Sequence, residues 1–235
     1  MNKNTKIGFM ILAIFLITSL GTSKNALINN REEALDFYKK KYGAINPYSK
    51  TISFHFARAD KITNKDLEHL KYFPDLSYIS LGGENITDDT LEFLKDKTEL
   101  EAILLYNTKV AGEGFRYLKN LKKIDTILIH DSPFTDIGLK YISEIRFKDN
   151  IEINLHKTKV TDQGLKYLAK VKLKGGLSLI NTAITDGGLK YLANQKELNE
   201  LNLQGTKVTK AGAEWLMKQL PNTDVLYGEF IEEKD

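Results

Sequence analysis

Cysteine is absent from all 235 residues of this chain, and proline and tryptophan are scarce, with four and one copies. The absence of cysteine excludes disulfide bonds, zinc–thiolate sites, cysteine nucleophiles and a lipid-modified N-terminal cysteine. A strong excess of charge is also missing, because the formal net charge is only +3. Nucleic-acid-binding proteins usually carry a strong and local positive field. We therefore predict no nucleic-acid partner.

Sequence motifs of catalysis are missing as well. The chain holds no G-x-S-x-G, H-E-x-x-H, P-loop or G-x-G-x-x-G motif. Acidic residues are numerous, yet no pair stands out as a buried acid–base couple. We predict that the protein is not an enzyme and uses no cofactor. Apolar residues make up 42% of the chain and charged residues 28%, which suits one globular or solenoidal domain.

The N-terminus has the pattern of a targeting segment. Lys3 and Lys6 precede an uncharged, mostly apolar run, Ile7–Ser23, that ends in three small residues. This pattern is typical of a secretory signal peptide, residues 1–23, cleaved before Lys24. The alternative is an uncleaved membrane anchor, because a spanning helix needs at least about 17 residues. Both alternatives place the remaining chain outside the cytoplasm, secreted or in the periplasm or cell envelope, with membrane contact only through an uncleaved N-terminus.

Most of the remaining chain is an internal repeat. One position recurs at steps of 24, 24, 24, 26, 24 and 24 residues: Thr63, Thr87, Ala111, Thr135, Thr161, Thr185 and Thr209. The best copies of the opening motif read T-D-x-G-L-K-Y-[LI], as in Thr135–Ile142. The closing motif reads L-x-x-L-x-L-x-x-T-x-[VI], as in Leu198–Val208. A fixed period of this length indicates a solenoid of stacked units.

Each half of the unit predicts one element. The opening Thr is a helix N-cap residue, and the Asp beside it favours the positive end of the helix dipole. Leu165 and Leu168 are three apart and share one helical face. Leu201 and Leu203 are two apart and share one face of a strand. Neither element buries its apolar face alone, so stacking of the units builds the core.

These motifs resemble the leucine-rich repeat family, in particular the 24-residue bacterial form with T-D-x-G-L-x-x-L helices. The resemblance covers residues 63–227 and implies a curved α/β solenoid with parallel strands on the concave face and helices on the convex face. The consensus polar position mostly holds hydroxyl residues, which we expect to bond turn backbone: Thr108, Ser132, Thr158, Thr182 and Thr206. Two extra residues within Ile145–Asn150, and Lys174 at a leucine position, break the frame of units four and five.

The flanking segments have the patterns of caps. In residues 24–62, the sequence predicts a helix over Asn30–Tyr42 and a first strand over Thr51–Phe56 that covers the open core. At the other end, Val225 and Tyr227 predict a last, degenerate strand. Residues 228–235 form a short and mostly acidic tail.

The candidate site lies where one repeat position recurs on every strand of the concave face. The first three units would bring together Tyr78, Leu104, Tyr106 and Leu128, and exposed apolar patches often mark partner sites. The rim of this patch would hold His130, Asp131, His156 and Lys157. The alternative is that the N-terminal segment folds over the patch. The two histidines, with the nearby carboxylate, suit a metal ion or a pH-sensitive contact, but most such pairs do neither, and we predict no metal site.

We interpret the chain as an exported, monomeric, non-catalytic binding module whose concave face binds a protein partner. Protein binding is what the family resemblance implies. Two alternatives stay open: a structural component of the cell envelope, and a secreted effector or adaptor that acts on a host protein.

Overall fold

The computed structural model describes residues 30–42, 51–53 and 62–230. Its strands form one parallel sheet in chain order. They are β1 (Thr51–Ser53), β2 (Tyr78–Gly82), β3 (Ala102–Tyr106), β4 (Thr126–His130), β5 (Ile151–Asn154), β6 (Leu173–Ser178), β7 (Leu198–Asn202) and β8 (Asp224–Leu226). The α-helices are α2 (Arg31–Tyr42), α4 (Asn64–Leu67), α5 (Asp136–Ile142), α6 (Asp162–Leu168), α7 (Asp186–Leu189) and α8 (Lys210–Gln219). The 3₁₀ helices are η1 (Glu68–Tyr72), η2 (Asp88–Leu94) and η3 (Glu113–Leu118).

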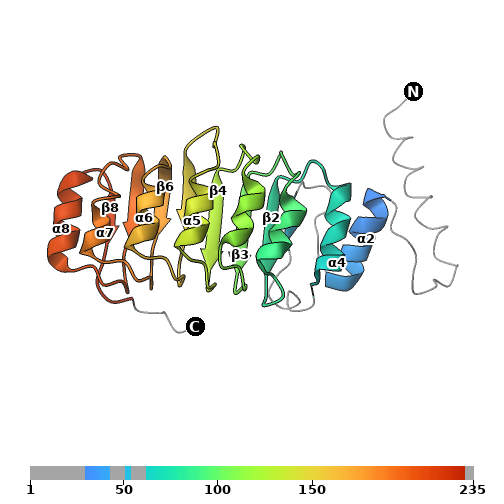
Figure 1. Ribbon diagram of the computed structural model, residues 1–235, viewed down its shortest axis with the longest axis horizontal. Helices are drawn as coiled ribbons and strands as arrows, with labels where there is room; N and C mark the ends of the chain where they lie inside the picture. The colour runs from blue at the N-terminus through green and yellow to red at the C-terminus, as the bar shows by residue number, and fades with distance from the viewer. Residues whose placement is uncertain (1–29, 43–50, 54–61, 231–235) are drawn as a thin grey trace, which may run out of the picture.

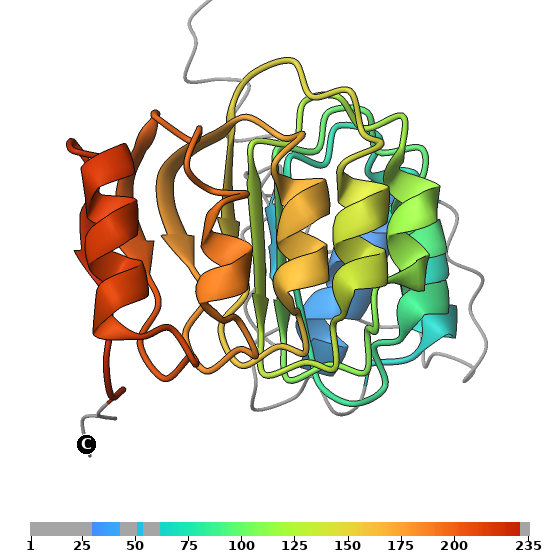
Figure 2. The ribbon, with the colours of Figure 1, turned by 60° about the vertical axis from the view of Figure 1, so that its left-hand side comes forward.

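The helical segments stand in a row along one side of the sheet, from α2 at one end to α8 at the other (Figures 1 and 2). Equivalent residues of neighbouring strands pair in register, for example Ile79 with Ile103 and Ile103 with Ile127. These three side chains are fully buried in the core. Because alternate residues of a strand point to opposite sides, their neighbours lie on the other face, called the concave face below. This architecture confirms the predicted α/β repeat solenoid.

An aspartate clamp joins successive repeats. The backbone N–H and the hydroxyl of Thr185 donate to the two carboxylate oxygens of Asp162, at 2.8 and 2.6 Å. The equivalent pairs are Thr161 with Asp136 and Thr209 with Asp186. The sequence predicted only a helix-dipole interaction for this aspartate. Stacking adds two hydrogen bonds to the next unit, because residues about 24 apart lie side by side in a solenoid.

The glycine of the T-D-x-G motif makes room for the clamp. A Cβ atom on Gly188 would lie 2.4 Å from Asp162 Oδ1, and a Cβ atom on Gly212 would lie 2.0 Å from Asp186 Oδ1. Neither glycine has a positive φ, so the requirement is for space and not for backbone conformation. The opening motif therefore specifies how closely two repeats approach.

A buried carboxylate anchors the N-terminal helix. Asp66 is 4% exposed and accepts hydrogen bonds from Lys41 Nζ at 2.5 Å and from the Tyr42 hydroxyl at 2.6 Å. The Thr63 N–H and hydroxyl donate to the same carboxylate. Burial by itself would raise the pKa of Asp66, but these hydrogen bonds outweigh it and lower the pKa below its ordinary value. The Tyr38 hydroxyl donates to the backbone carbonyl of Asp66, so both α2 tyrosines hold α2 on the first repeat.

Several predictions concern residues beyond the described ranges. The signal peptide or anchor at residues 1–23 lies outside them, as do residues 54–56 of the predicted first strand and the end of the acidic tail. Among the helices that the structure describes, none combines the length and the apolar character needed to cross a membrane.

Candidate binding surface on the concave face

Three columns of side chains run across the concave face, because the strands pair in register. The first column is Tyr78, Ala102, Thr126, Glu152, Gly176 and Glu200. The second column is Ser80, Leu104, Leu128, Asn154, Ser178 and Asn202. The third column, at the carboxyl ends of the strands, is Gly82, Tyr106, His130, His156, Ile180 and Gln204. The predicted site residues therefore occupy the N-terminal half of this face and one of its edges.

The apolar patch keeps three of its four predicted members at the surface. Tyr78, Tyr106 and Leu128 are half-buried. Leu104 is only 7% exposed, so its prediction as an exposed residue is wrong. Its register partners Ser80 and Leu128 flank it at the strand spacing, and Tyr106 lies two residues along the same strand face. Burial, with a smaller contribution from Tyr78, raises the pKa of Tyr106.

A row of rings continues from the patch along the edge of the sheet. The ring centroids of Tyr106 and His130 are 5.3 Å apart, those of His130 and His156 are 5.6 Å apart, and those of His156 and Phe230 are 5.4 Å apart. The two histidines are therefore neighbours, as the repeat register predicted. The pKa of His130 is lowered, mainly by burial and to a smaller extent by the nearby charge of His156. The participation of Phe230 was not predicted, because it comes from the segment after β8.

Asp131 and Lys157 belong to the turn that follows each strand. They have positive φ, 48° and 52°, as do the equivalent Asn107 and Asn181. Glycine, Asn and Asp tolerate this left-handed conformation, whereas lysine is strained in it. The backbone N–H of Asp131 donates to the His156 carbonyl, so the turns are tied across the repeats. Lys157 Nζ lies 3.8 Å from Asp131 Oδ1, and both side chains are substantially exposed. The two residues lie at the carboxyl-end edge of the sheet, next to the ring of His130 or His156, and their role in binding stays a prediction.

The C-terminal half of the concave face has a different chemistry. In the first column, Gly176 pairs with Glu200, and Glu152 takes the same position on the preceding strand. A Cβ atom on Gly176 would meet no atom within 4 Å, so a hollow opens between the two carboxylates. Asn154 and Ser178 line the same hollow, and the Ser178 hydroxyl is buried with no hydrogen-bond partner among the described residues. The repeat alignment already places Glu152, Gly176 and Glu200 in one column. That the missing side chain of Gly176 leaves a hollow between the carboxylates is evident only from the folded sheet.

Within residues 30–42, 51–53 and 62–230, no group of three His, Asp or Glu side chains is placed to share a metal ion. The His130 ring contacts the rings of Tyr106 and His156, and its Nε2 atom is buried with no hydrogen-bond partner among the described residues. The arrangement suits contact with another molecule through rings, aliphatic groups and carboxylates.

Comparison with known proteins supports the fold alone. No protein-family model matches the sequence, and the search of curated proteins found no match. Among solved structures, the chain is similar to the crystal structure of the internalin InlF from Listeria monocytogenes, with a TM-score of 0.54 and 18% sequence identity. The similarity covers 78% of this chain and 48% of the internalin chain, so it spans about half of that protein. The fold is accordingly a leucine-rich repeat fold.

Proposed function

We propose that this protein is an exported binding module whose concave face holds a segment of a protein partner across the strands. The observation that carries the proposal is the continuity of one surface: the partly exposed apolar residues, the row of rings and the carboxylate-lined hollow all lie on the helix-free face. A leucine-rich repeat fold suits protein binding in general, and its strand face is an extended surface formed by side chains of many repeats. We also propose that the repeats are of the 24-residue bacterial type, on the basis of their T-D-x-G-L-x-x-L motifs.

The apolar end of the surface would supply most of the binding energy. Tyr78, Tyr106 and Leu128 each present a partly exposed side chain next to the buried Leu104. Tyrosine at an interface combines a large apolar area with few rotatable bonds, so it contributes strongly when it is covered. A partner would place aliphatic or aromatic side chains here, with His130, Asp131, His156 and Lys157 contacting its polar groups at the rim.

The other end of the surface favours a basic side chain. Glu152 and Glu200 flank the hollow over Gly176, and neither makes an ion pair with any residue that the structure describes. An arginine or lysine placed between them would gain two carboxylate partners without displacing an internal pair. We expect a partner segment that carries apolar residues at one end and a basic residue at the other.

Export rests on the predicted signal peptide or anchor at residues 1–23, which places the partner outside the cytoplasm of the producing cell. A structural component of the envelope is the second candidate function, because one face could contact several neighbours weakly. An effector or adaptor that acts on a host protein is the third. A specific partner captured by the concave face would favour the module over the structural role.

The test is affinity capture from envelope and culture extracts with residues 24–235 as bait and mass spectrometry as readout. Two variants act on the two ends of the surface: Tyr106→Ala with Leu128→Ala removes apolar contacts, and Gly176→Val fills the hollow. Gly176 has no positive φ and an added Cβ has open space, so the second variant should fold normally. The exposed helix residue Gln163 provides a matched control as Gln163→Ala.

A protein retained by the unchanged bait and by the control, and lost by both concave-face variants, would support the proposal. Equal recovery on all four baits would move the site away from the concave face. Circular dichroism of each bait would separate loss of binding from loss of fold.

A further inference from the structure

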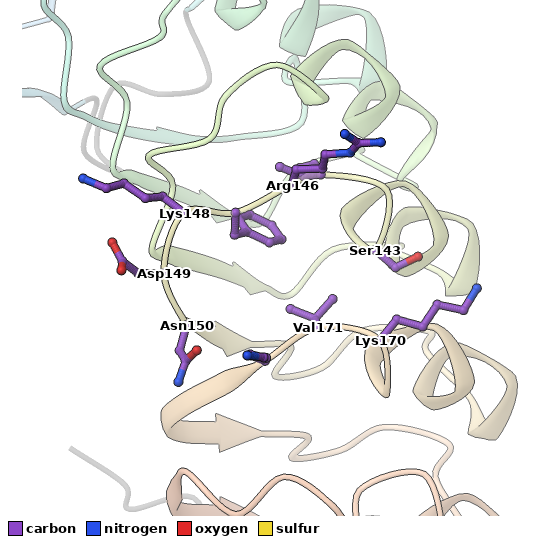
Figure 3. A pocket seen from close by; sticks show the side chains of 10 residues that line it. Ser143, Arg146, Lys148, Asp149, Asn150, Lys170 and Val171 are labelled. Atoms are coloured by element: carbon purple, nitrogen blue, oxygen red, sulfur yellow. The ribbon is translucent and has the colours of Figure 1, made fainter.

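The fourth repeat, which is two residues longer than the others, borders a hollow. Its loop from helix α5 to strand β5 holds the two additional residues that interrupt the 24-residue period. The hollow lies between this loop and the shorter loop of the next repeat (Figure 3). Extra residues in a solenoid repeat are not needed for the stacking of the units. They lie in loops, often on the face that binds another molecule.

The side chains around the hollow are mostly basic. Arg146 and Lys148 come from the longer loop, and Lys170 and Lys172 come from the next loop, whereas Asp149 is the only acid in the lining. All four basic residues are exposed. In Figure 3, Lys148 extends to the left of the hollow, whereas Arg146 and Lys170 extend to its right, so the charged groups border different sides of it.

These cations are not neutralised within the described part of the chain. No ion pair is found there for Arg146, Lys148, Lys170 or Lys172, and Lys170 Nζ lies 5.6 Å from the centre of the Tyr167 ring. Other lysines on the same edge of the solenoid do have partners. Their pairs are Lys123 with Glu99, at 2.6 Å, and Lys174 with Asp125, at 3.7 Å. The four cations around the hollow therefore lack the carboxylate partners that these two lysines have.

The floor of the hollow is held in place by buried groups. Ile145 and Val171 are each 5% exposed and belong to the hydrophobic core. Gln195 of the following repeat is buried, donates to the Val171 carbonyl at 2.9 Å and accepts from the Leu173 N–H at 3.2 Å. These two bonds bracket the backbone of Lys172.

Neighbouring loops are also bonded to one another. The Lys148 N–H donates to the Lys122 carbonyl at 2.9 Å, and the Ile151 N–H donates to the Lys172 carbonyl at 3.0 Å. Consecutive repeats therefore present their basic residues from a fixed backbone, so little ordering of the loops would be needed on binding.

We propose that this hollow is a binding site for the phosphate groups of a multivalent anion. Arginine binds phosphate oxygens through two parallel hydrogen bonds, and lysine ammonium groups add point charges around them. Four uncompensated cations repel one another, and a multivalent anion removes that repulsion while it makes charge-assisted hydrogen bonds. The protein is nearly neutral overall, with a formal charge of +3, so the attraction is local. The site is separate from the concave face and does not depend on the proposed function.

The first test uses sodium tripolyphosphate as the probe and isothermal titration calorimetry at low salt. The proposal predicts saturable binding by the purified protein, weakened by added sodium chloride because salt screens exposed charges. The variant Arg146→Gln with Lys172→Gln should weaken binding about tenfold or more, the size expected for a lost charge-assisted hydrogen bond. The control Lys166→Gln with Lys190→Gln removes two exposed charges from the helix side and should change affinity less than about twofold.

A second arm distinguishes free phosphate from lipid headgroups. Vesicles of phosphatidylcholine with and without phosphatidylglycerol are sedimented with the protein and with the same two variants. Sedimentation that needs phosphatidylglycerol and is lost in Arg146→Gln with Lys172→Gln would assign the phosphate groups to a bilayer. Tripolyphosphate binding without sedimentation would assign them to a soluble anion.

Binding of tripolyphosphate or of phosphatidylglycerol vesicles supports the site, provided that Arg146→Gln with Lys172→Gln loses this binding and Lys166→Gln with Lys190→Gln keeps it. Equal effects of the two variant pairs, or no binding of either probe, would overturn the proposal. Lys148→Gln with Lys170→Gln repeats the test from the other half of the rim, so a folding defect in one variant leaves a second measurement.

Discussion

The geometry of the aspartate clamp predicts that alanine destabilises the protein at Gly188 but has little effect at the adjacent Gly187 of α7. Gly188→Ala places a Cβ atom 2.4 Å from Asp162 Oδ1, so the carboxylate must move away. Gly187→Ala places its Cβ atom no closer than 3.3 Å to Asp162 Oδ2. Both glycines lie in the same helix and neither has a positive φ. Only the first substitution should break the clamp.

The expected magnitude follows from the bonds that are lost. Asp162 accepts two hydrogen bonds from Thr185, and a hydrogen bond to a charged acceptor contributes about 1.5 kcal/mol or more. Losing both costs about 3 kcal/mol, and the reduced entropy of the unfolded chain on replacing glycine by alanine returns up to about 1 kcal/mol. Gly188→Ala should therefore lower the free energy of unfolding by about 2 kcal/mol. Gly187→Ala should stay within about 0.5 kcal/mol of the parent protein.

Thermal unfolding followed by circular dichroism measures the difference. For a chain of this size, about 2 kcal/mol corresponds to a Tm decrease of about 4–8 °C. A double-mutant cycle adds a second criterion. Asp162→Ala alone should cost about 3 kcal/mol, but it should cost little more in the Gly188→Ala background, because the carboxylate has already been displaced. Equal Tm values for the two glycine variants, or fully additive costs in the cycle, would refute the reasoning.

Three further predictions rest on single residues. Lys157→Asn should raise Tm by a few degrees, because it relieves about 1 kcal/mol of left-handed strain, which exceeds the contribution of a long, exposed ion pair such as the one with Asp131. An unchanged Tm would show that the turn is not strained. The lowered pKa of His130, caused by burial and by His156, predicts that the unfolded chain binds the proton first as pH falls below about 6.5. Tm should therefore fall from neutral to acid pH more in the parent protein than in His130→Gln, and identical pH profiles would contradict this. Asp66→Ala should release α2, which limited proteolysis would detect as early cleavage before the first repeat.

The sequence determined the architecture of this protein because its signal is periodic. Each unit repeats the same helix and strand pattern, so the period alone specifies which leucines are buried and which positions form columns across the sheet. The hydroxyls at the consensus polar position illustrate how far such reasoning reaches. Thr158, Thr182 and Thr206 donate to the backbone carbonyl three residues earlier, which confirms the expectation that these hydroxyls bond turn backbone.

Only the tertiary structure decided how neighbouring units meet. Whether Leu104 is exposed depends on Ser80 and Leu128 at its sides, and the partner of the Asp162 carboxylate comes from the following repeat. Phe230 reaches His156 because the chain turns back along the edge after the last strand. Pattern reasoning describes one unit at a time, whereas burial and charge compensation are properties of residues about 24 positions apart that stacking brings into contact.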